Sequence, residues 1–113
     1  MNIRDISKAD WKLFRERLPE WQEQYMERLT KEYIELLSSS DKASDRFWAL
    51  EERIKSDKKH PGVILRMNKA EVVWEIAMLV KTKVVTIKEL EGFSQGLIES
   101  VGELLEHRSM DDF

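Results

Sequence analysis

Residues 70–80, "AEVVWEIAMLV", decide the fold of this chain. Apart from Glu71 and Glu75, every residue in the stretch is apolar, and at helical spacing these residues cover almost every side of the helix. A helix of this kind lies at the centre of a domain or at an interface between subunits. Asn68, followed three residues later by Glu71, resembles a capping box that opens it. We therefore expect a helix over 70–80 as the central element.

Further helices are expected before this stretch, because large apolar residues recur there every three or four positions. Pro19 suits the first turn of a new helix, so the pair Leu18-Pro19 predicts a break between two helices. A strand over residues 63–67 is an alternative for the segment that precedes the central helix, but no second run is available to pair with it. The helices are predicted over residues 8–17, 20–37 and 45–58.

The helix over 45–58 has a predicted start and a predicted buried face. Ser44 or Asp45 is the expected N-cap residue. Its apolar positions follow the helical period, which predicts that they face inward. These positions are Phe47, Leu50 and Ile54.

Residues 91–97, "EGFSQGL", contain the pattern G-x-S-x-G of serine hydrolases. That pattern requires a strand directly before the serine and a histidine base later in the chain. Here the capping box Thr86-Ile87-Lys88-Glu89 predicts a helix before Ser94. Only His107 follows Ser94, on the same helical segment. We therefore predict that the match is a coincidence and that the protein is not an enzyme.

The same residues allow two structural hypotheses. In a continuous helix over 86–106, Gly92 would be an interior glycine that costs about 1 kcal/mol relative to alanine. In a broken helix, Gly92 ends one segment and Ser94 caps the next, which removes that cost. The second hypothesis is favoured. It predicts that Ser94→Asp keeps the fold and that Ser94→Ala costs about 1 kcal/mol.

Composition and charge limit the class of protein. The chain has 113 residues, of which 42% are hydrophobic and 36% charged, as in soluble globular domains. It has no apolar run near the ~20 residues that a membrane helix needs. The absence of cysteine and of a visible signal peptide favours a cytoplasmic location. We expect an all-α fold: one domain over 1–113, a compact bundle of five or six helices, with frayed ends at about 1–6 and 108–113.

Metal, cofactor and nucleic-acid sites receive little support. His60 and His107 are the only histidines, so no metal site is expected, and no motif predicts a cofactor. Residues 69–106 have the outline of a helix-turn-helix, which gives the alternative function of a nucleic-acid-associated regulator. However, residues 86–106 carry one lysine against five glutamates, and the net charge is −3. The candidate basic patch is Arg53, Lys55, Lys58 and Lys59.

Binding to a protein partner is the favoured function. Trp48 and Trp74 lie beside the main apolar stripes, and an exposed tryptophan favours a partner surface. The helix over 70–80 also suggests a homodimer. The candidate partner or dimer surface consists of Trp48, Trp74 and Met78.

Three runs of sequence carry a family resemblance: "DWKLFRERLPEWQEQYMERLTKEYIELL", "ASDRFWALEERIKSDKKHPGV" and "VVTIKELEGFS". Together they resemble a group of small, uncharacterised bacterial proteins that often carry the label "multidrug transporter". The resemblance covers about residues 10–105 and implies a small helical protein without a catalytic motif. Because the sequence has no membrane-length apolar segment, we do not infer transport.

Overall fold

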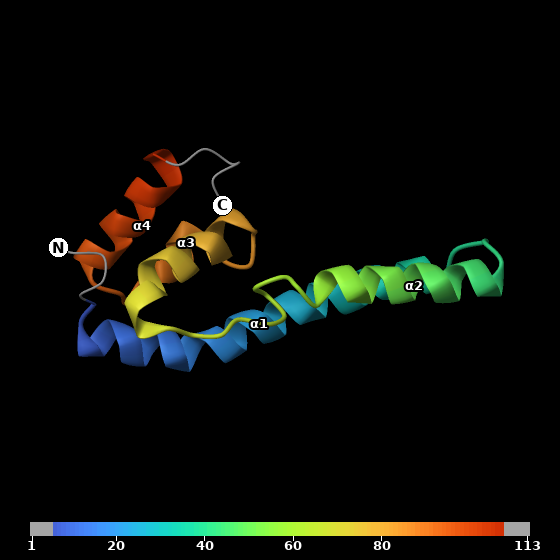
Figure 1. Ribbon diagram of the computed structural model, residues 1–113, viewed down its shortest axis with the longest axis horizontal. Helices are drawn as coiled ribbons and strands as arrows, with labels where there is room; N and C mark the ends of the chain where they lie inside the picture. The colour runs from blue at the N-terminus through green and yellow to red at the C-terminus, as the bar shows by residue number, and fades with distance from the viewer. Residues whose placement is uncertain (1–5, 108–113) are drawn as a thin grey trace.

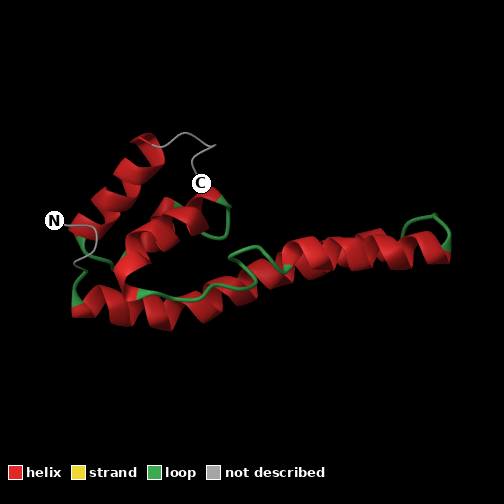
Figure 2. Ribbon diagram, viewed as in Figure 1, coloured by secondary structure: helices red, strands yellow, loops and turns green. Residues whose placement is uncertain are grey.

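The computed structural model describes residues 6–107. Its α-helices are α1 (Lys8–Leu37), α2 (Ala43–Asp57), α3 (Val72–Lys81) and α4 (Gln95–His107), and two 3₁₀ turns are η1 (Lys69–Glu71) and η2 (Ile87–Leu90). Loops join these elements, and residues 6–107 contain no β-strand (Figure 2). The expected frayed ends lie outside the described residues except for Ile6, which is part of the core.

The expected all-α class is confirmed, but the expected compact bundle of five or six helices is wrong. The molecule measures 55 × 29 × 22 Å and has a radius of gyration of 16.7 Å. A compact domain of this length would have a radius of about 13 Å. The structure is therefore a somewhat extended arrangement of four helices.

The extended shape arises from α1, which is about 45 Å long at 1.5 Å per residue. Its N-terminal half packs with α3 and α4, and we call residues 6–25 together with 62–107 the head. Its C-terminal half pairs with α2, and we call residues 26–57 the arm. Figure 1 shows the arm projecting from the head as two antiparallel helices.

Pro19 does not break the first helix, so the two helices predicted over 8–17 and 20–37 are one. A proline inside a helix removes one backbone hydrogen bond and costs about 3 kcal/mol. Leu18 and Trp21, on either side of it, are both buried in the same core as Phe14. A continuous helix keeps these three side chains on one face, and their packing offsets the cost of the proline.

The prediction of a central helix over 70–80 is confirmed by α3, which packs against α4 and α1. The predicted capping box before it is only partly right. The Asn68 side chain accepts a hydrogen bond from the Ala70 N–H, at the start of η1. The backbone N–H of Asn68 donates to the carboxylate of Glu75, 3.1 Å away, and not to Glu71. Burial raises the pKa of Glu75, while this hydrogen bond acts in the opposite direction.

Lys83 ends α3 in a left-handed conformation, with φ of 66°. The Lys83 N–H donates to Val80 O, and the Val84 N–H donates to Leu79 O. These two hydrogen bonds form a Schellman motif, in which the left-handed position is normally glycine.

Lys83→Gly should raise the free energy of unfolding by about 1 kcal/mol, because a side chain is unfavourable at this φ. Urea denaturation followed by circular dichroism would measure the change. Lys55→Gly, inside α2, is the control and should lower stability by about 1 kcal/mol. A loss of stability in Lys83→Gly would contradict the prediction.

The predicted break at Gly92 is confirmed. Gly92 has φ of 104°, η2 ends before it and α4 begins at Gln95. The Ser94 hydroxyl accepts a hydrogen bond from the Leu97 N–H, 3.2 Å away, as an N-cap does. The predicted capping box between Thr86 and Glu89 is also present, at the start of η2.

Ser94 also contacts a residue that the sequence did not point to. Asp10, in the first turn of α1, is 2% exposed. One of its carboxylate oxygens accepts from the Ser94 N–H at 2.8 Å, and the other accepts from the Ser94 hydroxyl at 2.6 Å. The carboxylate lies near the N-terminal ends of two helices, where the helix dipoles favour a negative charge. Asp10 therefore joins α1 to α4.

Candidate interaction surface

The two helices of the arm are held together by polar contacts along one seam. Arg53 on α2 forms an ion pair with Glu32 on α1 and a second one with Asp57, 3.1 Å away. Asp57 also accepts a hydrogen bond from the Tyr33 hydroxyl. Near the tip, Arg46 donates to the carbonyl of the last residue of α1. These contacts fix how α2 is rotated against α1.

α2 has no buried residue, which contradicts the expected inward face of this helix. Phe47 is 60% exposed and Ile54 is 38% exposed, while Leu50 is half-buried. The predicted caps Ser44 and Asp45 are also wrong, because α2 begins at Ala43 without a side-chain cap. The apolar residues of α2 do follow the helical period, but α2 packs along α1 and contributes no residue to the core of the head.

Four of the five exposed large apolar residues of the arm lie on the same side of it. At 100° per residue, Leu37 lies about 140° around α1 from Glu32. Phe47 lies about 120° around α2 from Arg53. Glu32 and Arg53 meet on one side of the helix pair. Because the helices are antiparallel, the rotation from Glu32 to Leu37 and the rotation from Arg53 to Phe47 run in opposite senses when both are viewed from the same end of the arm. Leu37 and Phe47 therefore both lie on the side of the arm opposite the Glu32–Arg53 ion pair.

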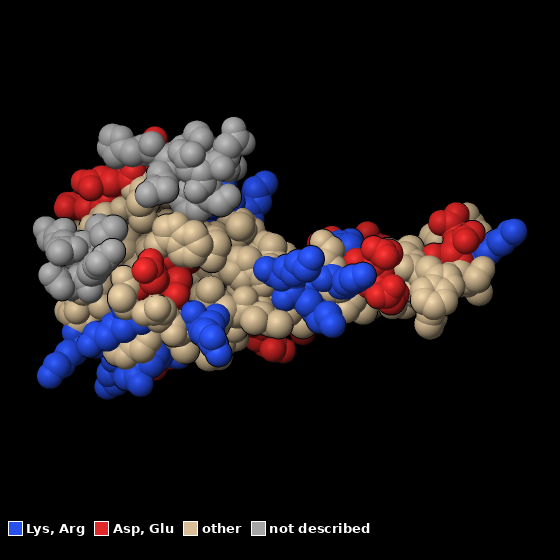
Figure 3. Space-filling view, in the orientation of Figure 1, with Lys and Arg blue, Asp and Glu red and all other residues tan. Residues whose placement is uncertain are grey.

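We call this side the apolar arm face. Ile34 on α1 is 63% exposed, and Leu37 is 42% exposed. Ile34 lies about 160° around α1 from the core residue Leu18, so this side chain points away from the core of the head. In Figure 3, uncharged side chains occupy the lower edge of the arm near its tip. The members of the apolar arm face are Ile34, Leu37, Phe47 and Ile54, with half-buried Leu50 between the helices.

The predicted partner residues lie on two separate parts of the molecule. Trp48 is 61% exposed on the arm and meets Phe47 edge to face, with ring centroids 4.8 Å apart. Trp74 and Met78 are half-buried on α3, in the head. The sequence therefore identified Trp48, at the edge of the exposed surface, but predicted that Phe47 and Ile54 are buried. The signal available in the sequence was the narrow apolar stripe of α2, which consists of Phe47, Leu50 and Ile54 in a helix of fifteen residues.

The four residues of the predicted basic patch do not form one surface. The guanidinium of Arg53 is engaged by Glu32 and Asp57 in the seam of the arm. Lys55, Lys58 and Lys59 are exposed around the C-terminal end of α2. Lysines at a helix C-terminus are favoured by its dipole without any ligand.

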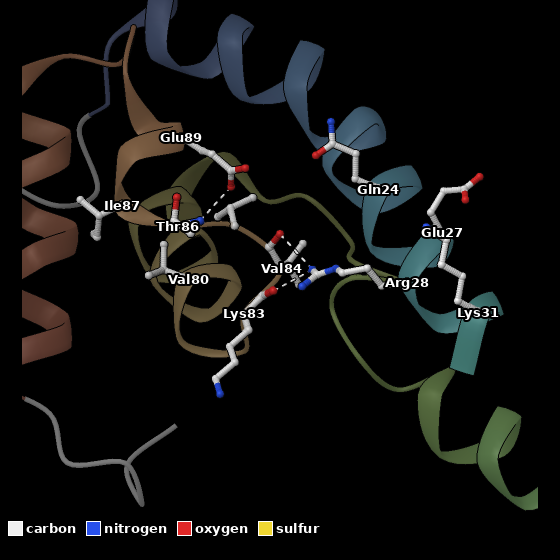
Figure 4. A pocket seen from close by; sticks show the side chains of 11 residues that line it. Gln24, Glu27, Arg28, Lys31, Val80, Lys83, Val84, Thr86, Ile87 and Glu89 are labelled. Atoms are coloured by element: carbon white, nitrogen blue, oxygen red, sulfur yellow. Dashed lines mark hydrogen bonds between the residues drawn. The ribbon is translucent and has the colours of Figure 1, made fainter. Parts of the chain in front are cut away.

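A hollow of about 820 Å³ lies between α1 and the segment 80–89 (Figure 4). Arg28 reaches across it and donates to the Lys83 carbonyl at 2.8 Å. Lys31 and Lys83 line the hollow together with Glu27 and Glu89, so its charges are mixed. The arrangement ties α1 to the loop after α3 and shows no preference for a ligand of one charge.

His60 connects the base of the arm to the head. Its ring stacks on Tyr25 of α1, with centroids 4.5 Å apart. Its Nδ1 accepts a hydrogen bond from the Gly62 N–H at 3.0 Å, and the ring also hydrogen-bonds the backbone of Thr82 at the end of α3. An Nδ1 that accepts is unprotonated, so this contact requires the neutral ring.

His60 should make stability fall in mild acid. Burial lowers its pKa from the usual 6.5, Arg28 acts in the same direction, and Asp57 and Thr82 act against it. The unfolded chain then binds the proton more readily, so the contribution of His60 is complete above about pH 6.5 and is lost as pH falls below that. Urea denaturation at pH 7.5 and 5.0 should show a larger loss for the natural chain than for His60→Gln. Equal losses in both chains would contradict this role.

Comparisons with protein-family models, curated proteins and solved structures found no match, so the family resemblance remains a prediction. Among residues 6–107, no helix is both long and apolar enough to cross a membrane. The same part of the chain has no group of three or more His, Cys, Asp or Glu side chains arranged to hold a metal ion.

Proposed function

We propose that this protein acts by binding a protein chain through the apolar arm face. The observation that carries the proposal is the exposure of four apolar side chains on one side of a helix pair whose helix α2 has no fully buried residue. These side chains are Ile34, Leu37, Phe47 and Ile54. A contiguous apolar patch of this kind is typical of a protein interaction site. Aromatic residues such as Phe47 and Trp48 are common anchors of such sites.

The alternatives receive less support. The exposed positions of α4 include Glu99, Glu103 and Glu106, which would repel a nucleic-acid backbone. The hydroxyl of Ser94 donates to Asp10 and accepts from Leu97, so both of its hydrogen-bonding functions serve the fold. No observation therefore favours nucleic-acid binding or a serine nucleophile over protein binding.

Photo-crosslinking in the native host would test the proposal. A benzophenone amino acid at position 47 should form adducts with protein, whereas the same group at position 49 should not. Ala49 is exposed on the same helix, but it lies about 200° from Phe47, on the side of the Glu32–Arg53 ion pair. The adducts should disappear when Ile34→Glu is added. Equal yields from positions 47 and 49 would contradict the proposed function.

A further inference from the structure

We infer that the chain that covers the apolar arm face is a second copy of this protein, and that two arms pair to form a four-helix bundle. This inference rests on the proposed function, because it names the partner of the same surface. It does not involve the helix that the sequence suggested for a dimer, since the apolar side chains of α3 are largely used in the head.

The shape of the arm is the first argument. The arm is a single layer of two antiparallel helices, with a polar seam on one side and an apolar face on the other. Four-helix bundles consist of two such layers packed face to face. Leu37 follows Ile34 by three residues, and Ile54 follows Phe47 by seven, which are spacings found in bundle cores. A second copy supplies a layer with the same length and the same spacing.

The available area is the second argument. The four side chains of the apolar arm face are 38–63% exposed. At about 150–200 Å² for a whole side chain, they expose roughly 300–400 Å² on each arm. The face is about 22 Å long, the length of α2, and about 20 Å wide. A face of that size covers about 440 Å² per partner, so two copies bury about 900 Å² in total, an area found among weak, reversible contacts.

The charge of the arm is the third argument. Residues 26–57 contain six basic and eight acidic side chains, distributed along both helices. A surface with both signs interspersed does not select a strongly charged partner, and two copies of it do not repel each other strongly. The seam ion pairs, Glu32–Arg53 and Arg53–Asp57, form within one arm and leave the opposite side free of charge pairs.

Analytical ultracentrifugation of the purified full chain, from about 2 to 200 µM, would test the inference. At 200 µM the expected mass approaches twice the chain mass of 13.4 kDa, with a dissociation constant of about 10–100 µM, as suits a contact of this size. Phe47→Glu should weaken the association by about 100-fold, because it places a charge in the apolar contact. Ala49→Glu adds the same charge on the other side of α2 and should change the association by less than about 3-fold.

A folding defect would not explain such a result, because Phe47 is already 60% exposed in the single chain. Circular dichroism should therefore show the same helix content for Phe47→Glu and Ala49→Glu. Dissociation should also change little between about 0.05 and 0.5 M NaCl, as expected for an apolar contact. Equal association of the two variants, or assemblies larger than a dimer, would overturn the inference.

The outcomes separate this inference from the proposed function. A chain that stays monomeric at 200 µM, but whose position 47 is crosslinked to a different protein in cells, would overturn self-pairing and keep the protein-binding function. A monomer without adducts from position 47 would overturn both.

Discussion

Ser94→Asp is expected to lower the free energy of unfolding by about 3 kcal/mol, although aspartate is as good an N-cap residue as serine. The new carboxylate would lie within hydrogen-bonding distance of the buried carboxylate of Asp10, which now accepts from the Ser94 hydroxyl at 2.6 Å. The lost hydrogen bond and the repulsion between two like charges both destabilise the folded state. This result reverses the prediction made from the sequence, which considered only the cap.

A double-mutant cycle would identify Asp10 as the cause. Asp10→Asn replaces one carboxylate oxygen by an amide nitrogen, which can donate to the carboxylate of Ser94→Asp. The double variant should therefore recover at least half of the stability that Ser94→Asp loses, as measured by urea denaturation. If the loss is the same with Asp10 and with Asn at position 10, charge repulsion is not the cause.

Gly62→Ala is expected to destabilise the protein by about 2–3 kcal/mol. Gly62 is buried, and a Cβ atom added there would lie 2.3 Å from Cδ1 and 2.6 Å from Cγ of Tyr25. The ring cannot yield cheaply, because Cγ is its attachment point, His60 stacks on the ring and the Arg28 guanidinium lies over it, 5.1 Å from its centroid. The substitution therefore forces the base of the arm apart, as overpacking of a core does.

Gly102→Ala provides the matched control. Gly102 lies inside α4, and an added Cβ would have no atom within 4 Å. Alanine at this position should raise stability by about 1 kcal/mol, because it is the better helix former. Tyr25→Ala should remove most of the penalty of Gly62→Ala, since the clash disappears with the ring. A penalty that persists in the double variant would show that Gly62 is needed for another reason.

The sequence predicted those parts of the fold that depend on local signals. The apolar stretch of α3, the capping box of Thr86 and the break at Gly92 are all determined by residues within one or two turns of each other. The parts it did not predict depend on contacts between distant segments. Pro19 is tolerated because the residues beside it are buried against α3 and α4. Asp10 hydrogen-bonds to Ser94, which lies 84 positions further along the chain.

Only part of the candidate surface was predicted, again because the exposure of a helix face depends on distant segments of the chain. Trp48 was recognised because it lies off the main stripe of its helix, and it is exposed. Phe47 and Ile54 lie on that stripe, and a stripe indicates that a helix has an apolar side without indicating what covers it. Only the position of α2, beyond the reach of α3 and α4, shows that this side is exposed.

The continuity of α1 through Pro19 has a mechanical consequence. A single helix of 30 residues runs through both the head and the arm, so no flexible linker separates them. A chain bound to the arm would be held at a fixed distance and orientation from α3 and α4, as by a rigid spacer. The number of residues in α1 sets its length, and this length would then determine the distance between the head and a chain bound to the arm.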